Sequence, residues 1–202
     1  MNHQDPVLKQ ALKGDWHLLA PAIRAHYDLA PFTDQQVLVE GRMENVTHSA
    51  RANLLIPFAR LAGALIPFVG SNVPVRVINY SRPHRPDYYW DRVFSFPGRK
   101  PFRFASRMVC SGDHEITEYV RLGFGLRLRV SVQDGALIET DRGYVLTMGK
   151  LSIPVPLNAL MGSAYIEESP VNSDAFDMRM TLKHRVFGET FAYNGRFALA
   201  TQ

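Results

Sequence analysis

An arginine inside an aromatic stretch is the first feature of the sequence that could do chemistry. With the side-chain alternation of a β-strand, residues 88–96 place Arg92 on the same face as Trp90 and further aromatic rings. A guanidinium on such a face must stack on a ring, pair with a carboxylate or contact a ligand. Glu118 falls on the predicted inward face of a later strand. We therefore expect both charges to lie inside the protein.

Two interpretations of Arg92 and Glu118 remain open. Burying either charge alone is costly, so the two side chains should be paired or solvated. In the first interpretation they form an ion pair that fixes the register of neighbouring strands. In the second, Arg92 binds an anionic group of a ligand, and Glu118 is its resting partner or a general base. A shift of the strand register by one residue would place both side chains outside.

Other residue types that carry out chemistry form no motif. The seven histidines lack the spacing of metal ligands, and Cys110 is the single cysteine. No glycine-rich phosphate loop follows a predicted strand, and no serine lies in a nucleophile elbow. The sequence therefore predicts neither a metal site nor a bound cofactor.

Composition and charge restrict the class of protein. The chain has 202 residues, of which 46% are hydrophobic and 21% charged, so we expect one globular domain over residues 1–202. The net charge of +4 is scattered rather than clustered, which argues against nucleic acid as a partner. No apolar stretch is long enough to cross a bilayer, and no signal peptide is recognisable, so a cytoplasmic location is expected.

The elements that must position the two charges are predicted β-strands. About ten strands follow one another at hairpin spacing over residues 36–200, which is typical of an antiparallel meander that curls into a barrel. A helical segment is predicted over residues 1–30, and a long apolar helix over 51–68 is expected on or inside the sheet. The fold class is mainly β (α+β), a single-domain antiparallel β-barrel with N-terminal helices.

Two local patterns make sharper predictions within this barrel. Residues 137–140 and 144–148 read as two strands joined by a turn at 141–143. Residues 153–157 contain two prolines, which lack the N–H donors that a central strand needs. We therefore expect this segment to cross outside the sheet and to end in a short helical turn at 158–161.

The predicted interior is rich in aromatic residues and methionine. Such side chains suit an apolar ligand, and barrels of about eight or more strands can hold a small one. The same side chains could instead fill the core, and the sequence leaves both arrangements open. The candidate ligand-binding residues are Trp90, Arg92, Phe94, Phe104, Glu118, Met178 and Tyr193.

Three functions are compatible with this pattern. The leading interpretation is a protein that binds a small apolar or lipid-like ligand inside the barrel, including a ligand whose acidic group meets Arg92. The second is an enzyme without a cofactor, an isomerase or hydrolase, that uses Glu118 as base and Arg92 to stabilise an anion. The third is a structural or partner-binding domain with a filled core.

The order of short motifs resembles that of a bacterial family, domain of unknown function 4166, over residues 18–199. The motifs are Trp90-x-Arg92-x-Phe94, Ser106, Glu118-x-x-Arg121-x-Gly123, Asp134-Gly135-x-Leu137, Pro154-x-Pro156-Leu157, Phe176-x-Met178 and Gly188-x-x-x-x-Tyr193-x-Gly195-x-Phe197. The resemblance implies that several candidate residues sit at family motif positions, but it implies no activity. In that family the domain occurs alone or behind a saccharopine-dehydrogenase-like NAD(P)-binding domain, which implies a redox enzyme as a partner.

Overall fold

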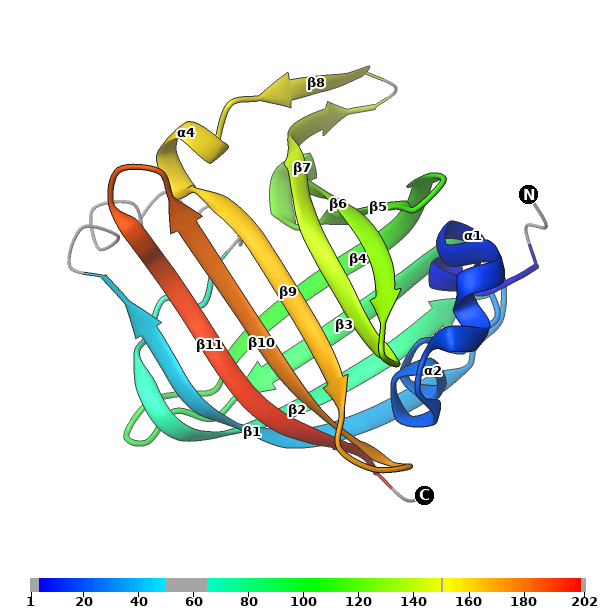
Figure 1. Cartoon of the computed structure of the whole chain (residues 1–202), viewed down its shortest axis with the longest axis horizontal. Coiled ribbons are helices and arrows are strands. Elements are labelled where there is room, and N and C mark those ends of the chain that lie inside the picture. Colours follow the sequence, from blue (N-terminus) through cyan, green and yellow to red (C-terminus); the bar gives the residue numbers. More distant parts are fainter. Residues whose placement is uncertain (1–3, 50–64, 150, 201–202) are drawn as a thin grey trace.

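A computed structural model describes residues 4–49, 65–149 and 151–200 of the chain. Its main feature is a closed antiparallel β-barrel of ten strands with one further strand outside (Figure 1). The barrel strands are β1 (Gln36–His48), β2 (Gly70–Arg82), β3 (Arg85–Phe94), β4 (Phe102–Gly112), β5 (Glu115–Tyr119), β6 (Phe124–Gln133), β7 (Ala136–Met148), β9 (Ser163–Pro170), β10 (Ala175–His184) and β11 (Gly188–Leu199). The predicted antiparallel barrel is confirmed.

Most neighbouring strands are consecutive hairpins, and two non-local pairings complete the ring. The strand order is β6-β5-β4-β3-β2-β1-β11-β10-β9-β7, and β6 pairs with β7 to close it. The first and last strands, β1 and β11, therefore lie side by side, with Val39 opposite Leu199 (Figure 1). Closure leaves no unpaired edge within the ring, which removes the usual site of strand-to-strand aggregation.

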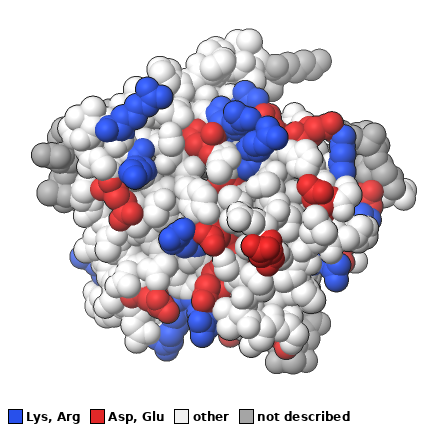
Figure 2. Space-filling model, viewed as in Figure 1, with Lys and Arg blue, Asp and Glu red and all other residues white. Residues whose placement is uncertain are grey.

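Alternating side chains explain why these segments form strands with one buried face. In β2 the side chains of Val73, Val75 and Val77 are buried, while Pro74 and Arg76 between them are exposed. Side chains therefore alternate along the strand, and every second one points toward the interior. The exposed side chains carry charges of both signs, which are interspersed over the face shown in Figure 2. For example, Arg179 of β10 forms an ion pair with Glu167 of the neighbouring strand β9 at 2.9 Å.

The predicted N-terminal helical segment is present and covers one end of the barrel. It consists of α1 (Val7–Leu12), the 3-10 helix η1 (Lys13–Leu18) and α2 (Pro21–Tyr27), where proline takes the first helical position. Backbone hydrogen bonds join the segment to two hairpin turns, from His114 to Ala11 and from Ala20 to Gly135. Figure 1 shows these helices together at this end of the barrel. The segment therefore closes the interior from one side.

Two features differ from the sequence-based expectation. The apolar helix predicted over 51–68 falls largely on residues outside those described, and the described part, residues 65–68, is not helical. No turn separates residues 137–140 from 144–148, because both belong to the single strand β7. The Asp141 carboxylate accepts a hydrogen bond from the backbone N–H of Gly143, whose φ is +104°. This arrangement forms a bulge that bends the strand, so the predicted turn is wrong.

The bulge redirects the end of β7 away from β9. Beyond it, β7 pairs with β8 (Leu151–Val155), the strand outside the barrel, which contains Pro154. The prediction that these prolines lie outside a central strand is confirmed, but the expectation of a crossing segment is wrong, because β8 pairs with β7 as the edge strand of the sheet. The short helix α4 (Asn158–Met161) follows, as predicted, and the 3-10 helix η3 (Arg121–Gly123) links β5 to β6. None of the helices in the described ranges has the length and apolar character needed to cross a membrane.

Candidate ligand-binding site

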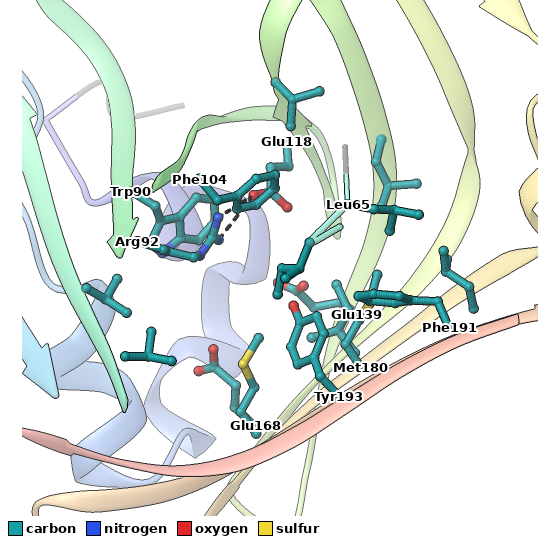
Figure 3. A pocket seen from close by; sticks show the side chains of 18 of the residues that line it. Leu65, Trp90, Arg92, Phe104, Glu118, Glu139, Glu168, Met180, Phe191 and Tyr193 are labelled. Atoms are coloured by element: carbon teal, nitrogen blue, oxygen red, sulfur yellow. Dashed lines mark hydrogen bonds and ion pairs between the residues drawn. The ribbon is translucent and has the colours of Figure 1, made fainter. Parts of the chain in front are cut away.

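The barrel contains a cavity of about 330 Å³. This volume lies in the range of about 300–1,000 Å³ that is typical of small-molecule sites. All the candidate residues from the sequence line it, namely Trp90, Arg92, Phe94, Phe104, Glu118, Met178 and Tyr193. The inward alternation of strands β3, β4, β5, β10 and β11 brings these residues together (Figure 3). The interior is therefore not completely filled by side chains.

The described wall is mostly apolar and comes from strands around the whole ring. Valines of β1 and β2 and aromatic and methionine side chains of β10 and β11 contribute to it, together with Leu65 and Ile66, which precede β2. Methionine is flexible and polarisable, so Met178 and Met180 can adapt to an irregular apolar shape. Such a wall favours a ligand that buries hydrocarbon.

Arg92 and Glu118 form an ion pair on this wall, with Ser106 between them. Nη2 of Arg92 lies 3.1 Å from Oε1 of Glu118, and both side chains are 15% exposed. Nη1 of Arg92 donates to Ser106 Oγ at 2.9 Å, and that hydroxyl donates to Glu118 Oε1 at 2.6 Å. The three residues come from the adjacent strands β3, β4 and β5, so the network links these strands through their side chains.

Two aromatic rings flank the Arg92 guanidinium. Its central carbon lies 4.6 Å from the ring centroid of Trp90 and 5.1 Å from that of Phe104. Rings at these distances attract a cation through their negative faces. Burial opposes the charge on Arg92, but the Glu118 carboxylate and the groups around it outweigh this effect and raise the pKa of Arg92. Arg92 is therefore held as a cation whose partner is already in place.

A second polar cluster joins α2 to β9 at the helical end of the cavity. The Tyr27 hydroxyl donates to Oε1 of Glu168 at 3.0 Å, and Nδ1 of His26 lies 3.4 Å from Oε2 of Glu168. The side chains of His26 and Glu168 are 6% and 5% exposed. Burial, together with the Glu168 carboxylate, raises the pKa of Tyr27 well above its usual range, so Tyr27 remains a hydrogen-bond donor.

Glu139 on β7 is the third carboxyl on the wall, and it differs from the other two. Glu139 is 5% exposed, and its buried Oε1 atom has no hydrogen-bond partner among the described residues. Burial raises the pKa of Glu139 well above its usual range, and Glu168 and Glu118 raise it further. Figure 3 shows the Glu139 carboxyl and the Tyr193 hydroxyl directed into the same part of the cavity. Burial also raises the pKa of Tyr193, which keeps that hydroxyl neutral.

The sequence reasoning missed Glu139, Glu168 and the two residues of α2. A signal for Glu168 was present, since it follows Ala164 and Ile166 on the inward face of one strand. Glu139 could be found in the same way, because it shares the inward face of β7 with Leu137. The position of α2 depends on tertiary packing against β9 and β10, and no local pattern predicts it.

The arrangement can bind polar groups, but it does not form a metal centre. Among residues 4–49, 65–149 and 151–200, no three His, Cys, Asp or Glu side chains are placed to hold a metal ion. The polar groups instead lie apart on an apolar surface, where they can orient one small molecule through hydrogen bonds.

The family model described as domain of unknown function (DUF4166) matches residues 19–197. No curated protein and no solved structure matches the chain significantly. The matched range contains every barrel strand except the last two residues of β11, together with α2 and all the candidate site residues. The chain therefore belongs to the DUF4166 family, as its order of motifs predicted.

Proposed function

We propose that this protein binds a small, largely apolar, lipid-like molecule inside its β-barrel. The observation that carries the proposal is the cavity of about 330 Å³, whose wall is mainly apolar and aromatic. Burying hydrocarbon against such a wall contributes roughly 25 cal/mol for each Å² removed from water. The few polar groups on the wall would then set the orientation of the molecule.

The geometry supports binding more directly than it supports catalysis. Glu118 Oε1 accepts hydrogen bonds from Arg92 and Ser106, which fits a side chain that is held in place on the cavity wall. A cofactor-independent isomerase or hydrolase that uses Glu118 and Arg92 remains a prediction, as does a redox enzyme as partner. A ligand whose acidic group meets Arg92 would have to compete with Glu118 for the guanidinium.

Native mass spectrometry of the protein as purified tests the proposal. The expected result is a mass increment that disappears on denaturation, with an apolar small molecule in the organic extract. Denatured and refolded protein serves as the matched ligand-free control. If the purified protein is bare and no apolar compound in a panel raises its melting temperature, the binding function is wrong, and a partner-binding role gains weight.

A further inference from the structure

The charges on the cavity wall are unbalanced toward the acidic side. Among the described lining residues, the carboxyl groups are Glu118, Glu139 and Glu168, and the single Lys or Arg is Arg92. The guanidinium of Arg92 is paired with Glu118 at 3.1 Å. No Lys or Arg of the described wall is therefore left to receive an anionic ligand group without displacing a carboxylate.

Three residues of the described wall have buried polar atoms without a hydrogen bond among the described residues, namely His26, Glu139 and Glu168. Glu118 is bound by Arg92 and Ser106, and Glu168 accepts the Tyr27 hydroxyl. Nδ1 of His26 and Oε2 of Glu168 lie 3.4 Å apart, whereas Glu139 Oε1 has neither a hydrogen bond nor an ion pair among the described residues. A buried polar atom without a partner is destabilising, so such an atom on a cavity wall points to a partner beyond the described residues.

The surroundings of Glu139 determine the chemistry of that partner. The Tyr193 hydroxyl points into the same region, while Glu168 and Glu118 are close enough to raise the pKa of the Glu139 carboxyl (Figure 3). The nearby carboxyl groups of Glu168 and Glu118 disfavour an anionic group at this position. A group that carries N–H or O–H donors would satisfy Glu139 and would gain from the negative potential of this region.

We propose that Glu139, together with Tyr193, binds a hydrogen-bond-donating group of the ligand, an amine or a hydroxyl, and that the cavity discriminates against carboxylates. This inference rests on the proposed binding function and makes it more specific. The hydrocarbon part of the ligand lies along the aromatic and methionine side chains of β3 and β10. Its polar end lies between β7 and β11, beside Glu139 and Tyr193.

A matched series with one alkyl chain tests this preference. Decylamine, decanol and decanoate are titrated into the wild-type protein at neutral pH by isothermal titration calorimetry. We expect decylamine and decanol to bind at least about tenfold more tightly than decanoate, the difference that one hydrogen bond to a charged or strongly polar group provides. Equal or tighter binding of decanoate overturns the inference but leaves the proposed function standing.

Two variants assign the preference to Glu139. Glu139→Leu should abolish the difference between the three compounds, whereas Glu139→Gln, which keeps an acceptor and a donor, should retain tight binding of decanol. Glu167→Leu is the matched control, because Glu167 precedes Glu168 on β9 and pairs with Arg179 on the outer surface at 2.9 Å. If the preference survives in Glu139→Leu, the assignment to Glu139 is wrong. If none of the compounds binds to the wild-type protein, both the inference and the binding function are contradicted.

Discussion

The Arg92–Glu118 pair links neighbouring strands and also lies on the cavity wall. Its hydrogen bonds run through Ser106 and connect three adjacent strands. The pair also lies on the cavity wall, with each side chain 15% exposed. Removing one partner leaves the other charge buried beside apolar groups, and such a loss is usually strongly destabilising.

We expect Arg92→Met to reduce the free energy of unfolding by about 3 kcal/mol, because Glu118 then loses its counter-charge. The double variant Arg92→Met/Glu118→Met should recover much of this loss, since it removes both charges. Urea denaturation of the wild type, the two single variants and the double variant measures the coupling energy. Additive effects would show that water in the cavity solvates the two charges independently and that the pair does not fix the strand register.

Glu139 makes stability depend on pH in a defined direction. Its carboxyl has a raised pKa in the folded protein because it is buried and faces Glu168 and Glu118, with Arg92 acting in the opposite sense. The folded state therefore holds its proton more tightly than the unfolded state does. The stability from this group is fully present below the usual carboxyl pKa near 4.5, and it is lost as the pH rises through the raised value.

Glu139→Gln should remove this dependence, because the amide stays neutral. The melting temperature of the variant minus that of the wild type should therefore increase between about pH 5 and 9, which thermal unfolding followed by circular dichroism can measure. Glu167→Gln is the control. Hydrogen bonding to Ser169 lowers the pKa of Glu167, so this substitution should change the pH dependence of stability only at acidic pH. Parallel curves for the wild type and Glu139→Gln would contradict the buried, protonated state of Glu139.

At the scale of the elements, the seam between β1 and β11 depends on two glycines. A Cβ atom added at Gly195 would meet the backbone carbonyl oxygen of Arg42, and one at Gly41 would meet the carbonyl oxygen of Arg196. Gly195 is opposite Met43, next to the register shift between Met43 and Asn45. The two strands therefore approach each other more closely at this point than side chains on both would permit.

Gly195→Ala should reduce the free energy of unfolding by about 2 kcal/mol, because the added methyl group forces the two backbones apart. Gly14→Ala is the matched control, since an added Cβ there has no atom within 4 Å. Chemical denaturation of both variants measures the difference. If the two variants are equally stable, the seam is flexible enough to absorb a methyl group.

At the scale of the whole molecule, the two tryptophans report on different regions. Trp90 lines the cavity, whereas Trp16 is buried in η1 and is not among the described lining residues. Binding of an apolar molecule should therefore change the fluorescence of Trp90 alone. We expect a saturable change in Trp16→Phe that is absent in Trp90→Phe. A signal that persists in Trp90→Phe would place the bound molecule outside the cavity.

The local pattern of the sequence was sufficient to predict most strands and their hairpin partners. Alternation along residues 88–96, for example, placed Trp90, Arg92 and Phe94 on the inner face, and the structure has all three on the cavity wall. Local pattern could not predict that β1 pairs with β11, because these strands lie at opposite ends of the sequence. It also read the Asp141–Gly143 bulge as a turn, since both features use the same residue types.

The candidate site was predictable where it depends on strand alternation and not where it depends on packing. Strand alternation predicted that Arg92 and Glu118 both lie inside the barrel, and the structure shows an ion pair between them. Tyr27 and His26 reach the cavity only because α2 packs on β9 and β10, which residue spacing within α2 does not reveal. The cavity also depends on the volume left between side chains, and this cannot be obtained from the order of residues.

The helical segment at one end of the barrel has a consequence for the rate of exchange. Its backbone is bonded to two hairpin turns, its Leu8 and Leu12 are fully buried, and Tyr27 is held by Glu168. A molecule beside Tyr27 can leave on this side only after those contacts break together. Departure by that route would therefore require a local unfolding event, and its rate would depend on the stability of the contacts between these helices and the barrel.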